Sequence, residues 1–178
     1  MCGALASSAG GRQGQARDTT AHECLEEAPD GAMVAREQHA ESAMKLEGGC
    51  YCGDVRYVAE GEPMMKAQCH CRECQYITGG SPNMFIAMPI TGFSYTKGTP
   101  KQFKRSDLER PVTREFCAEC GTHLATRPQS FPAMIVKVGT LDDPSLFGTP
   151  NMAIYTIDKQ AFHQIPDGLP TFDRLPNR

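Results

Sequence analysis

Seven of the nine cysteines lie in three short clusters, and these clusters constrain the fold and chemistry of the chain more than any other feature. The clusters are Cys50-x-Cys52, Cys69-x-Cys71-x-x-Cys74 and Cys117-x-x-Cys120. Thiolates at such short spacings can ligate one soft cation, and Zn²⁺ prefers them in tetrahedral sets. Seven thiolates divide into one complete set of four and one set of three. A set of three leaves a coordination position for water or substrate, so the count predicts a reactive site beside a structural one.

The first and third clusters are predicted to form the complete set. Cys50 and Cys52 alternate in sequence, and side chains two residues apart in an extended strand point the same way. Cys117 and Cys120 form a Cys-x-x-Cys knuckle, and the glycine after Cys120 allows the positive φ that such a turn requires. We therefore expect Cys50, Cys52, Cys117 and Cys120 to hold a structural Zn²⁺ that joins distant parts of the chain.

The middle cluster is predicted to form the open site, in which Cys69, Cys71 and Cys74 are ligands of a catalytic Zn²⁺. Two alternatives stay open. The site can be a closed structural one completed by His70 or His123, or the three cysteines can be metal-free thiols. His70 lies between two of the ligands and is expected to point away from the metal, where it would orient them.

The rest of the composition favours a reducing environment. The chain has 178 residues, no run of about 18 apolar residues and no apolar core of a signal peptide near its start. An odd number of cysteines without an export signal disfavours a disulfide framework. We expect two Zn²⁺ per chain, no membrane partner and a cytoplasmic location, where clustered cysteines more often bind metal than form disulfides.

The chain divides into two parts by composition. Residues 1–43 have three Arg against seven Asp plus Glu and no aromatic residue, so they cannot bury enough apolar surface to fold. We interpret them as a disordered tail or a mis-assigned start, because Met44 opens the structured pattern. Residues 44–178 are predicted to form one zinc-binding domain.

Short apolar runs separated by turn residues predict an all-β fold for this domain. No helical periodicity extends over ten or more residues, and Asp142 is a candidate cap for a single short turn. The expected strands cover residues 54–59, 84–88, 93–97, 102–104, 112–116, 134–138 and 152–157.

Other site classes are disfavoured. The chain has no P-loop, no Gly-x-Ser-x-Gly and no His-Glu-x-x-His motif. One basic run covers residues 97–105, but residues 44–178 carry 15 Lys plus Arg against 14 Asp plus Glu. That balance lacks the broad positive charge of nucleic-acid binding proteins, so no nucleic-acid partner is expected.

In the order and spacing of its cysteines the sequence resembles the glutathione-dependent formaldehyde-activating enzyme family, which also includes centromere protein V. The resemblance extends from about Met44 to Pro176. The matching stretches are residues 49–55, 69–74, 114–122 and 167–176.

The resemblance implies a small, zinc-stabilised all-β fold of stacked antiparallel sheets with short strands and extended loops. It implies the two zinc sites described above, with the second one at the active site. It also implies a reversible carbon–sulfur lyase reaction, in which formaldehyde and glutathione combine as S-(hydroxymethyl)glutathione.

We therefore expect a zinc-dependent carbon–sulfur lyase acting on a small thiol–aldehyde adduct. Arg114, beside the knuckle, is a candidate for binding a substrate carboxylate. The alternatives are a non-catalytic zinc-binding interaction module and a thiol-based redox or metal sensor. An exposed β edge makes a homodimer possible.

Overall fold

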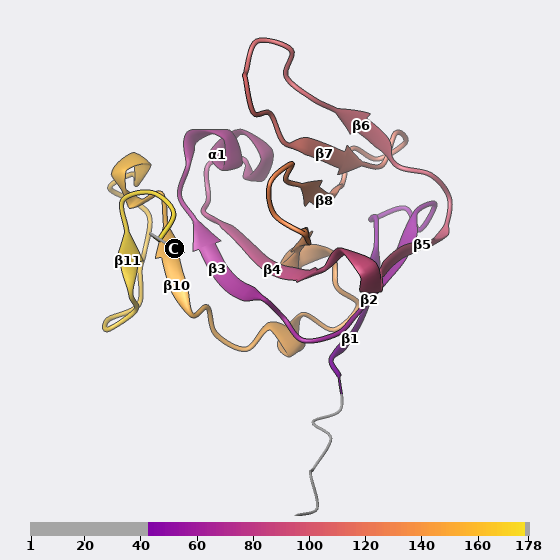
Figure 1. The fold of residues 1–178 in the computed structure, drawn as a ribbon, viewed down its shortest axis with the longest axis horizontal. Coiled ribbons are helices and arrows are strands. Elements are labelled where there is room, and N and C mark those ends of the chain that lie inside the picture. Colours follow the sequence, from indigo (N-terminus) through magenta and orange to yellow (C-terminus); the bar gives the residue numbers. More distant parts are fainter. Residues whose placement is uncertain (1–42, 177–178) are drawn as a thin grey trace, which may run out of the picture. The chain divides into compact units, whose positions relative to one another are not determined.

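The computed structural model describes residues 43–176 of the chain, and nearly all of the expected tail lies outside this range. The described residues contain eleven strands and one α-helix, together with four short 3₁₀ helices (Figure 1). The strands are β1 (Lys45–Gly49), β2 (Arg56–Glu60), β3 (Met65–Cys69), β4 (Asn83–Pro89), β5 (Phe93–Lys97), β6 (Lys101–Phe103), β7 (Thr113–Phe116), β8 (His123–Arg127), β9 (Ala133–Lys137), β10 (Met152–Ile154) and β11 (Thr171–Phe172). The helices are α1 (Arg72–Thr78), η1 (Ile90–Gly92), η2 (Val138–Thr140), η3 (Pro144–Phe147) and η4 (Thr156–Asp158).

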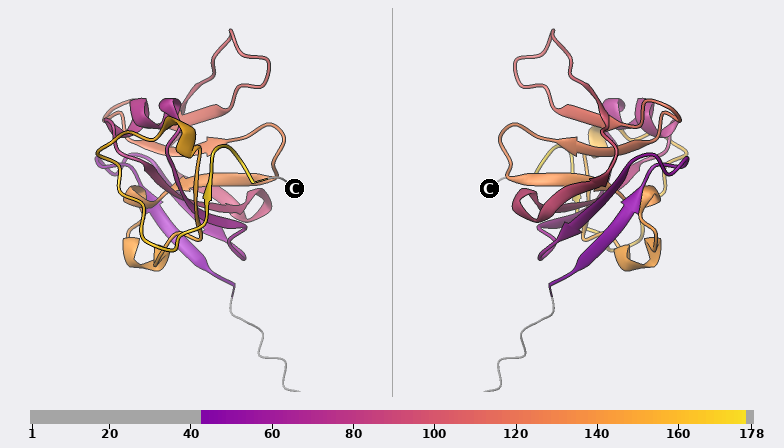
Figure 2. Two further views of the ribbon diagram at one scale, coloured as in Figure 1. Left: turned by 90° about the vertical axis from the view of Figure 1, so that its left-hand side faces the viewer. Right: turned by 90° about the vertical axis from the view of Figure 1, so that its right-hand side faces the viewer.

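The strands form two sheets. The smaller sheet has the order β1-β2-β5 and is antiparallel. The larger sheet has the order β11-β10-β3-β4-β9-β8-β7-β6. Figure 2 shows these layers from two sides, with the loop between β6 and β7 projecting from the sheet. The all-β expectation is confirmed.

The larger sheet is mixed rather than wholly antiparallel. From β3 to β6 the neighbouring strands are antiparallel, but β10 runs parallel to both β3 and β11. Parallel neighbours cannot be joined by a tight hairpin, and β10 follows β3 by more than eighty residues of chain. The pairing of β10 with β3 brings the C-terminal segment against the end of β3, where Cys69 lies.

Successive side chains along each strand of the larger sheet point to its two opposite faces, as strand geometry requires. On β4, Ile86 and Met88 face a core shared with Leu46 and Tyr57 of the smaller sheet. Phe85 and its alternate neighbours face the opposite side, which carries a second apolar cluster containing Cys69 and Cys74. The main core therefore lies between the sheets, and the three-cysteine cluster lies on the far face of the larger one.

The helix α1 was not predicted, because seven residues make two turns and give no readable periodicity. Its start is capped by the Cys71 side chain, whose Sγ accepts a hydrogen bond from the Cys74 N–H at 3.4 Å. Its end is set by Gly79, which adopts the left-handed conformation with φ of 72°.

One further local prediction needs correction. The capping residue of the short turn is Asp143 rather than Asp142, since its carboxylate accepts from the Ser145 N–H at 3.0 Å. Asp142 instead pairs with Arg56. Within residues 43–176, no helix has the length and apolar character that crossing a membrane requires.

Candidate metal centres

The four cysteines of the first predicted set lie together at the junction of the two sheets. Their Sγ atoms all lie within 4.8 Å of one another. Cys50 and Cys52 are 3.4 Å apart at Sγ, and Cys52 and Cys117 are 3.6 Å apart. Four sulfurs around one Zn²⁺ at ordinary bond lengths lie about 3.8 Å apart, so this group fits a tetrahedral metal.

Two turns bring these cysteines together. Cys50 and Cys52 lie in a turn after β1 rather than in an extended strand, as the Gly53 N–H donates to the Cys50 carbonyl at 3.0 Å. The second turn joins β7 to β8, and there Gly121 has φ of 72° and donates to the Cys117 carbonyl. One pair thus follows the smaller sheet and the other belongs to the larger, so a shared metal would link the two sheets.

Polar neighbours contact two of the four sulfurs of this group. The Val55 N–H donates to Cys50 Sγ at 3.2 Å. Thr122 Oγ1 lies 3.1 Å from Cys120 Sγ, and its hydrogen bond lowers the pKa of the Cys120 thiol to about 6. A lower pKa favours the thiolate, which is the form that binds metal.

The three cysteines of the second set lie at the end of β3 and the start of α1. The Sγ atoms of Cys69, Cys71 and Cys74 also lie within 4.8 Å of one another, and no His, Asp or Glu from residues 43–176 joins the group. Hydrogen bonds from the Cys69 and Cys71 thiols lower the pKa of Cys74 to about 3. Hydrogen bonds with Cys71 and Cys74 raise the pKa of Cys69. Three sulfurs in this arrangement can hold a metal and leave one coordination position free.

His70 lies behind the three-cysteine group in a fully buried network. His163 Nε2 lies 2.7 Å from the Gly80 carbonyl, which can only accept, so Nε2 carries the hydrogen. His163 Nδ1 is then an acceptor, and it lies 3.0 Å from His70 Nδ1, which must donate. His70 Nε2 accepts from the Gln68 amide at 3.0 Å. Both rings are neutral in this arrangement, and burial lowers the pKa of His70 to about 4.

The network ties the cysteine loop to the C-terminal segment. The Gln75 amide of α1 donates to the His70 carbonyl at 2.6 Å and to the Asp158 carbonyl at 2.9 Å. The Gln68 amide reaches the Gln164 carbonyl at 3.0 Å. His70 is therefore held away from the sulfurs as expected, and neither His70 nor His123 completes a four-ligand set with them.

A cavity of about 970 Å³ opens beside the three-cysteine group on the far face of the larger sheet. All three cysteines line it, whereas no cysteine of the first group does. Its apolar lining includes Met65, Phe85, Leu108, Val112, Phe131, Ile135, Ile154 and Leu175, and its charged lining consists of Arg72, Glu73, Arg110, Arg114, Lys137, Asp158 and Arg174.

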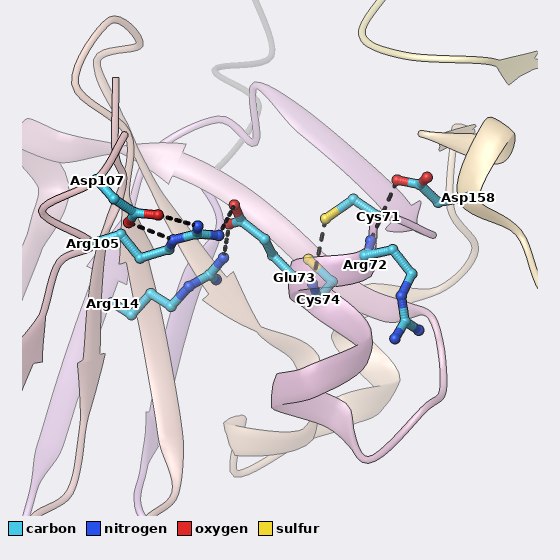
Figure 3. A network of polar contacts seen from close by, with 8 residues as sticks. All are labelled: Cys71, Arg72, Glu73, Cys74, Arg105, Asp107, Arg114 and Asp158. Atoms are coloured by element: carbon cyan, nitrogen blue, oxygen red, sulfur yellow. Dashed lines mark hydrogen bonds and ion pairs between the residues drawn. The ribbon is translucent and has the colours of Figure 1, made fainter. Parts of the chain in front are cut away.

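Arg114 lies in this cavity, but its partner is within the protein. Figure 3 shows Glu73 of α1 directed toward Arg114 and Arg105, with Cys71 and Cys74 close by. Arg114 Nη2 lies 2.5 Å from Glu73 Oε2, and the Arg114 side chain is only 11 % exposed. The pair fastens the start of α1 to β7 across the cavity wall.

Lys137 and Thr126 are cavity residues that sequence reasoning missed. Lys137 ends β9 and is 7 % exposed, and its burial lowers the pKa of the ammonium group. Thr126 of β8 is also 7 % exposed, and its hydroxyl has no hydrogen-bond partner among the described residues. One sequence feature could have pointed to Lys137, namely a charged residue at the end of the otherwise apolar strand Ala133–Lys137.

Comparison with known proteins decides the family. The profile described as "Glutathione-dependent formaldehyde-activating enzyme" matches residues 45–158, which contain all seven clustered cysteines. The chain belongs to this family. As a member of the formaldehyde-activating family, it is related to enzymes, and the cavity beside its three-cysteine group is the natural place for a small substrate.

The chain was also compared with curated proteins and with solved structures. A search of curated proteins finds no match. A crystal structure of a Rhodobacter sphaeroides protein is similar, with 18 % identity and a TM-score of 0.47. That similarity covers 58 % of this chain and 96 % of the other. For this member of the formaldehyde-activating family, the roles of the seven cysteines as zinc ligands stay predictions.

Proposed function

We propose that the chain is a zinc-dependent carbon–sulfur lyase that makes and breaks small thiol–aldehyde adducts such as S-(hydroxymethyl)glutathione. One observation carries the proposal. Three cysteines that can hold a metal with a free position line a cavity of about 970 Å³ in a member of the formaldehyde-activating family. That volume is at the upper end of the range for small-molecule sites, so it can accommodate a tripeptide thiol and an aldehyde together.

The two cysteine groups have different roles in this proposal. Cys50, Cys52, Cys117 and Cys120 hold a structural Zn²⁺, and Cys69, Cys71 and Cys74 hold the catalytic one. When bound in the open group, Zn²⁺ supplies a Lewis acid that favours the thiolate form of a thiol or polarises a carbonyl oxygen. We place the reaction in the cytoplasm, where the thiols stay reduced.

The chain's own residues orient the reactants. The buried His70 and Gln75 contacts fix the loop that carries the three sulfurs, and all three cysteines line the cavity. The apolar side chains of Phe85, Ile135 and Ile154 exclude water from the cavity floor. Arg110 and Arg174, on the cavity lining, supply positive charge for the carboxylates of a peptide thiol.

The test measures exchange between glutathione plus formaldehyde and their adduct by two-dimensional NMR, with the purified full chain. We expect exchange well above the uncatalysed rate, and about two Zn per chain by elemental analysis. The Cys71→Ser variant should return exchange to the uncatalysed rate and retain about one Zn per chain.

The matched control is Ser130→Ala, since Ser130 lines the cavity and forms no hydrogen bond with a cysteine among residues 43–176. It should leave both zinc content and exchange unchanged. Wild-type exchange at the uncatalysed rate would refute the lyase proposal for these substrates. Full exchange by the metal-depleted Cys71→Ser variant would refute the role of the three cysteines.

A further inference from the structure

The cavity that the three cysteines line also contains two buried polar residues that the proposed metal chemistry does not use. Lys137 and Thr126 each have only 7 % of their surface exposed, and both line the cavity. The hydroxyl of Thr126 is buried without a hydrogen-bond partner among residues 43–176. Buried polar groups in folded proteins are almost always paired, so an unpaired hydroxyl beside a buried lysine in one cavity indicates a missing ligand.

Strand register places the two side chains on the same face. Thr126 of β8 lies directly opposite Ile135 of β9, and Lys137 is two residues further along β9. Residues opposite each other, or two apart on one strand, share a face of the sheet. Diagonal neighbours of this kind have Cα atoms about 7–8 Å apart, so one small group can contact both side chains. Staggered rotamers about χ1 also allow the Thr126 hydroxyl to turn toward the cavity.

The carboxylates of the cavity lining are already engaged. Glu73 pairs with Arg114 and lies near Arg105. Asp158 accepts from the Arg72 N–H at 3.4 Å. Within the described residues, no ion pair or hydrogen bond of the Lys137 ammonium group is found. Burial lowers its pKa, and the nearby sulfurs of Cys74, Cys69 and Cys71 raise it.

A simpler explanation is that Lys137 only offsets the negative charge of the three thiolates. That explanation accounts for the position of Lys137 but leaves the Thr126 hydroxyl unpaired. It also predicts that removing the lysine changes metal retention first. A ligand oxygen bound between the lysine, the threonine and the metal position would satisfy both polar groups.

Given the lyase function proposed above, we propose that Lys137 and Thr126 bind the oxygen atom of the aldehyde carbon as it becomes negatively charged. The substrate sulfur attacks the carbonyl carbon and forms the C–S bond, and the C=O π electron pair moves onto oxygen. The ammonium and hydroxyl groups donate hydrogen bonds to that oxygen. The proton lost by the thiol then reaches the oxygen through water, which gives the hydroxyl group of the adduct.

The test uses a ligand with sulfur and a hydrogen-bond-accepting oxygen on one carbon. Thioacetate has both, and they share its one negative charge. Ethanethiol has the sulfur alone. Calorimetric titration of the zinc-loaded full chain should show that Lys137→Met weakens thioacetate binding by about tenfold or more. Thr126→Val should weaken it by about fivefold, and Thr126→Ser should restore it. Ethanethiol binding should change in none of these variants.

The control variant is Lys101→Met, which removes an exposed lysine on β6 and should leave both affinities unchanged. Zinc content should be the same in Lys137→Met as in the wild type. In the exchange assay, Lys137→Met should lower kcat with little change in KM for the thiol.

The outcomes separate this inference from the proposed function. Lys137-dependent thioacetate binding without any exchange activity would support the oxygen site and refute the lyase reaction. Active exchange with unchanged kcat in Lys137→Met would overturn the oxygen site and leave the lyase intact. Equal losses for thioacetate and ethanethiol, or loss of zinc from Lys137→Met, would also overturn it in favour of simple charge compensation.

Discussion

The two cysteine groups use the same ligand chemistry in opposite surroundings. The four-cysteine group lies where two turns meet at the junction of the sheets, and its sulfurs receive hydrogen bonds from Val55 and Thr122. The three-cysteine group lies at the end of β3 on the outer face of the larger sheet and lines a cavity. A complete ligand set at a junction stabilises a fold, whereas an incomplete set at a cavity leaves a position for a substrate. The proposed function therefore uses both the missing fourth sulfur and the adjacent cavity.

The largest effect is expected from breaking the four-cysteine group. Cys117→Ser should abolish the structural metal site, and metal binding of this kind contributes about 10 kcal/mol to folding in small zinc domains. We expect loss of the cooperative thermal transition, measured by circular dichroism. Cys71→Ser should keep that transition while losing exchange activity. If the two variants melted alike, the proposed division between structural and catalytic sites would be wrong.

A chelator should remove metal from the two cysteine groups at different rates. The three-cysteine site is open to a cavity, so a competing chelator can reach its metal directly. The four-cysteine site offers four sulfurs to one metal and leaves no ligand position free, although Cys52 is exposed. Slow titration with a chelator and a zinc-sensitive dye should show two phases of release. Exchange activity should disappear with the first phase, and secondary structure with the second. Release in a single phase would contradict the comparison.

Disrupting the His70–His163 contact should affect metal retention only in the three-cysteine group. His163→Phe removes the acceptor of His70 and leaves a buried N–H unpaired, which costs about 1–3 kcal/mol. We expect lower stability and faster metal loss from the three-cysteine group in the chelation assay. Phe162→Ala changes the neighbouring exposed ring and should do neither. Equal metal loss from both groups in His163→Phe would show that the network supports the whole domain.

The smallest effect on stability is expected from removing the Arg56–Asp142 ion pair. The Arg56 guanidinium lowers the pKa of Asp142, so the folded state binds this proton more weakly than the unfolded chain. The stabilisation is therefore present above the usual pKa of about 4 and is lost as the pH falls through the folded value. Both side chains are partly exposed, so the effect is about 0.5 kcal/mol. Asp142→Asn should lower the melting temperature slightly at pH 7 and change nothing at pH 2.

The sequence predicts the grouping of the cysteines well because their spacing is short. Strand β5 was predicted to the residue, since Phe93 to Lys97 alternates and ends at a glycine. Strands β3 and β8 were missed, because Met65–Cys69 and His123–Arg127 mix polar and apolar residues without a clear alternation.

The cavity could not be predicted, because its wall depends on the register between strands and on segments from residue 65 to residue 176. Lys137, Thr126 and Arg114 come from three strands, and nothing in their local sequence shows that they share a face. The partner of His70 is equally remote. The contact with His163 joins residues 93 positions apart, and only the parallel placement of β10 explains it.

That separation sets an order of assembly during synthesis. All four sulfurs of the first group have emerged once Cys120 is made, and chains generally fold from the N-terminal side as they grow. The segment that holds His70, from Gln160 to Gln164, appears forty residues later. A growing chain can thus secure its scaffold metal while the reactive loop still lacks its anchor. On the proposed function, the reactive site is then the last part of the domain to be completed.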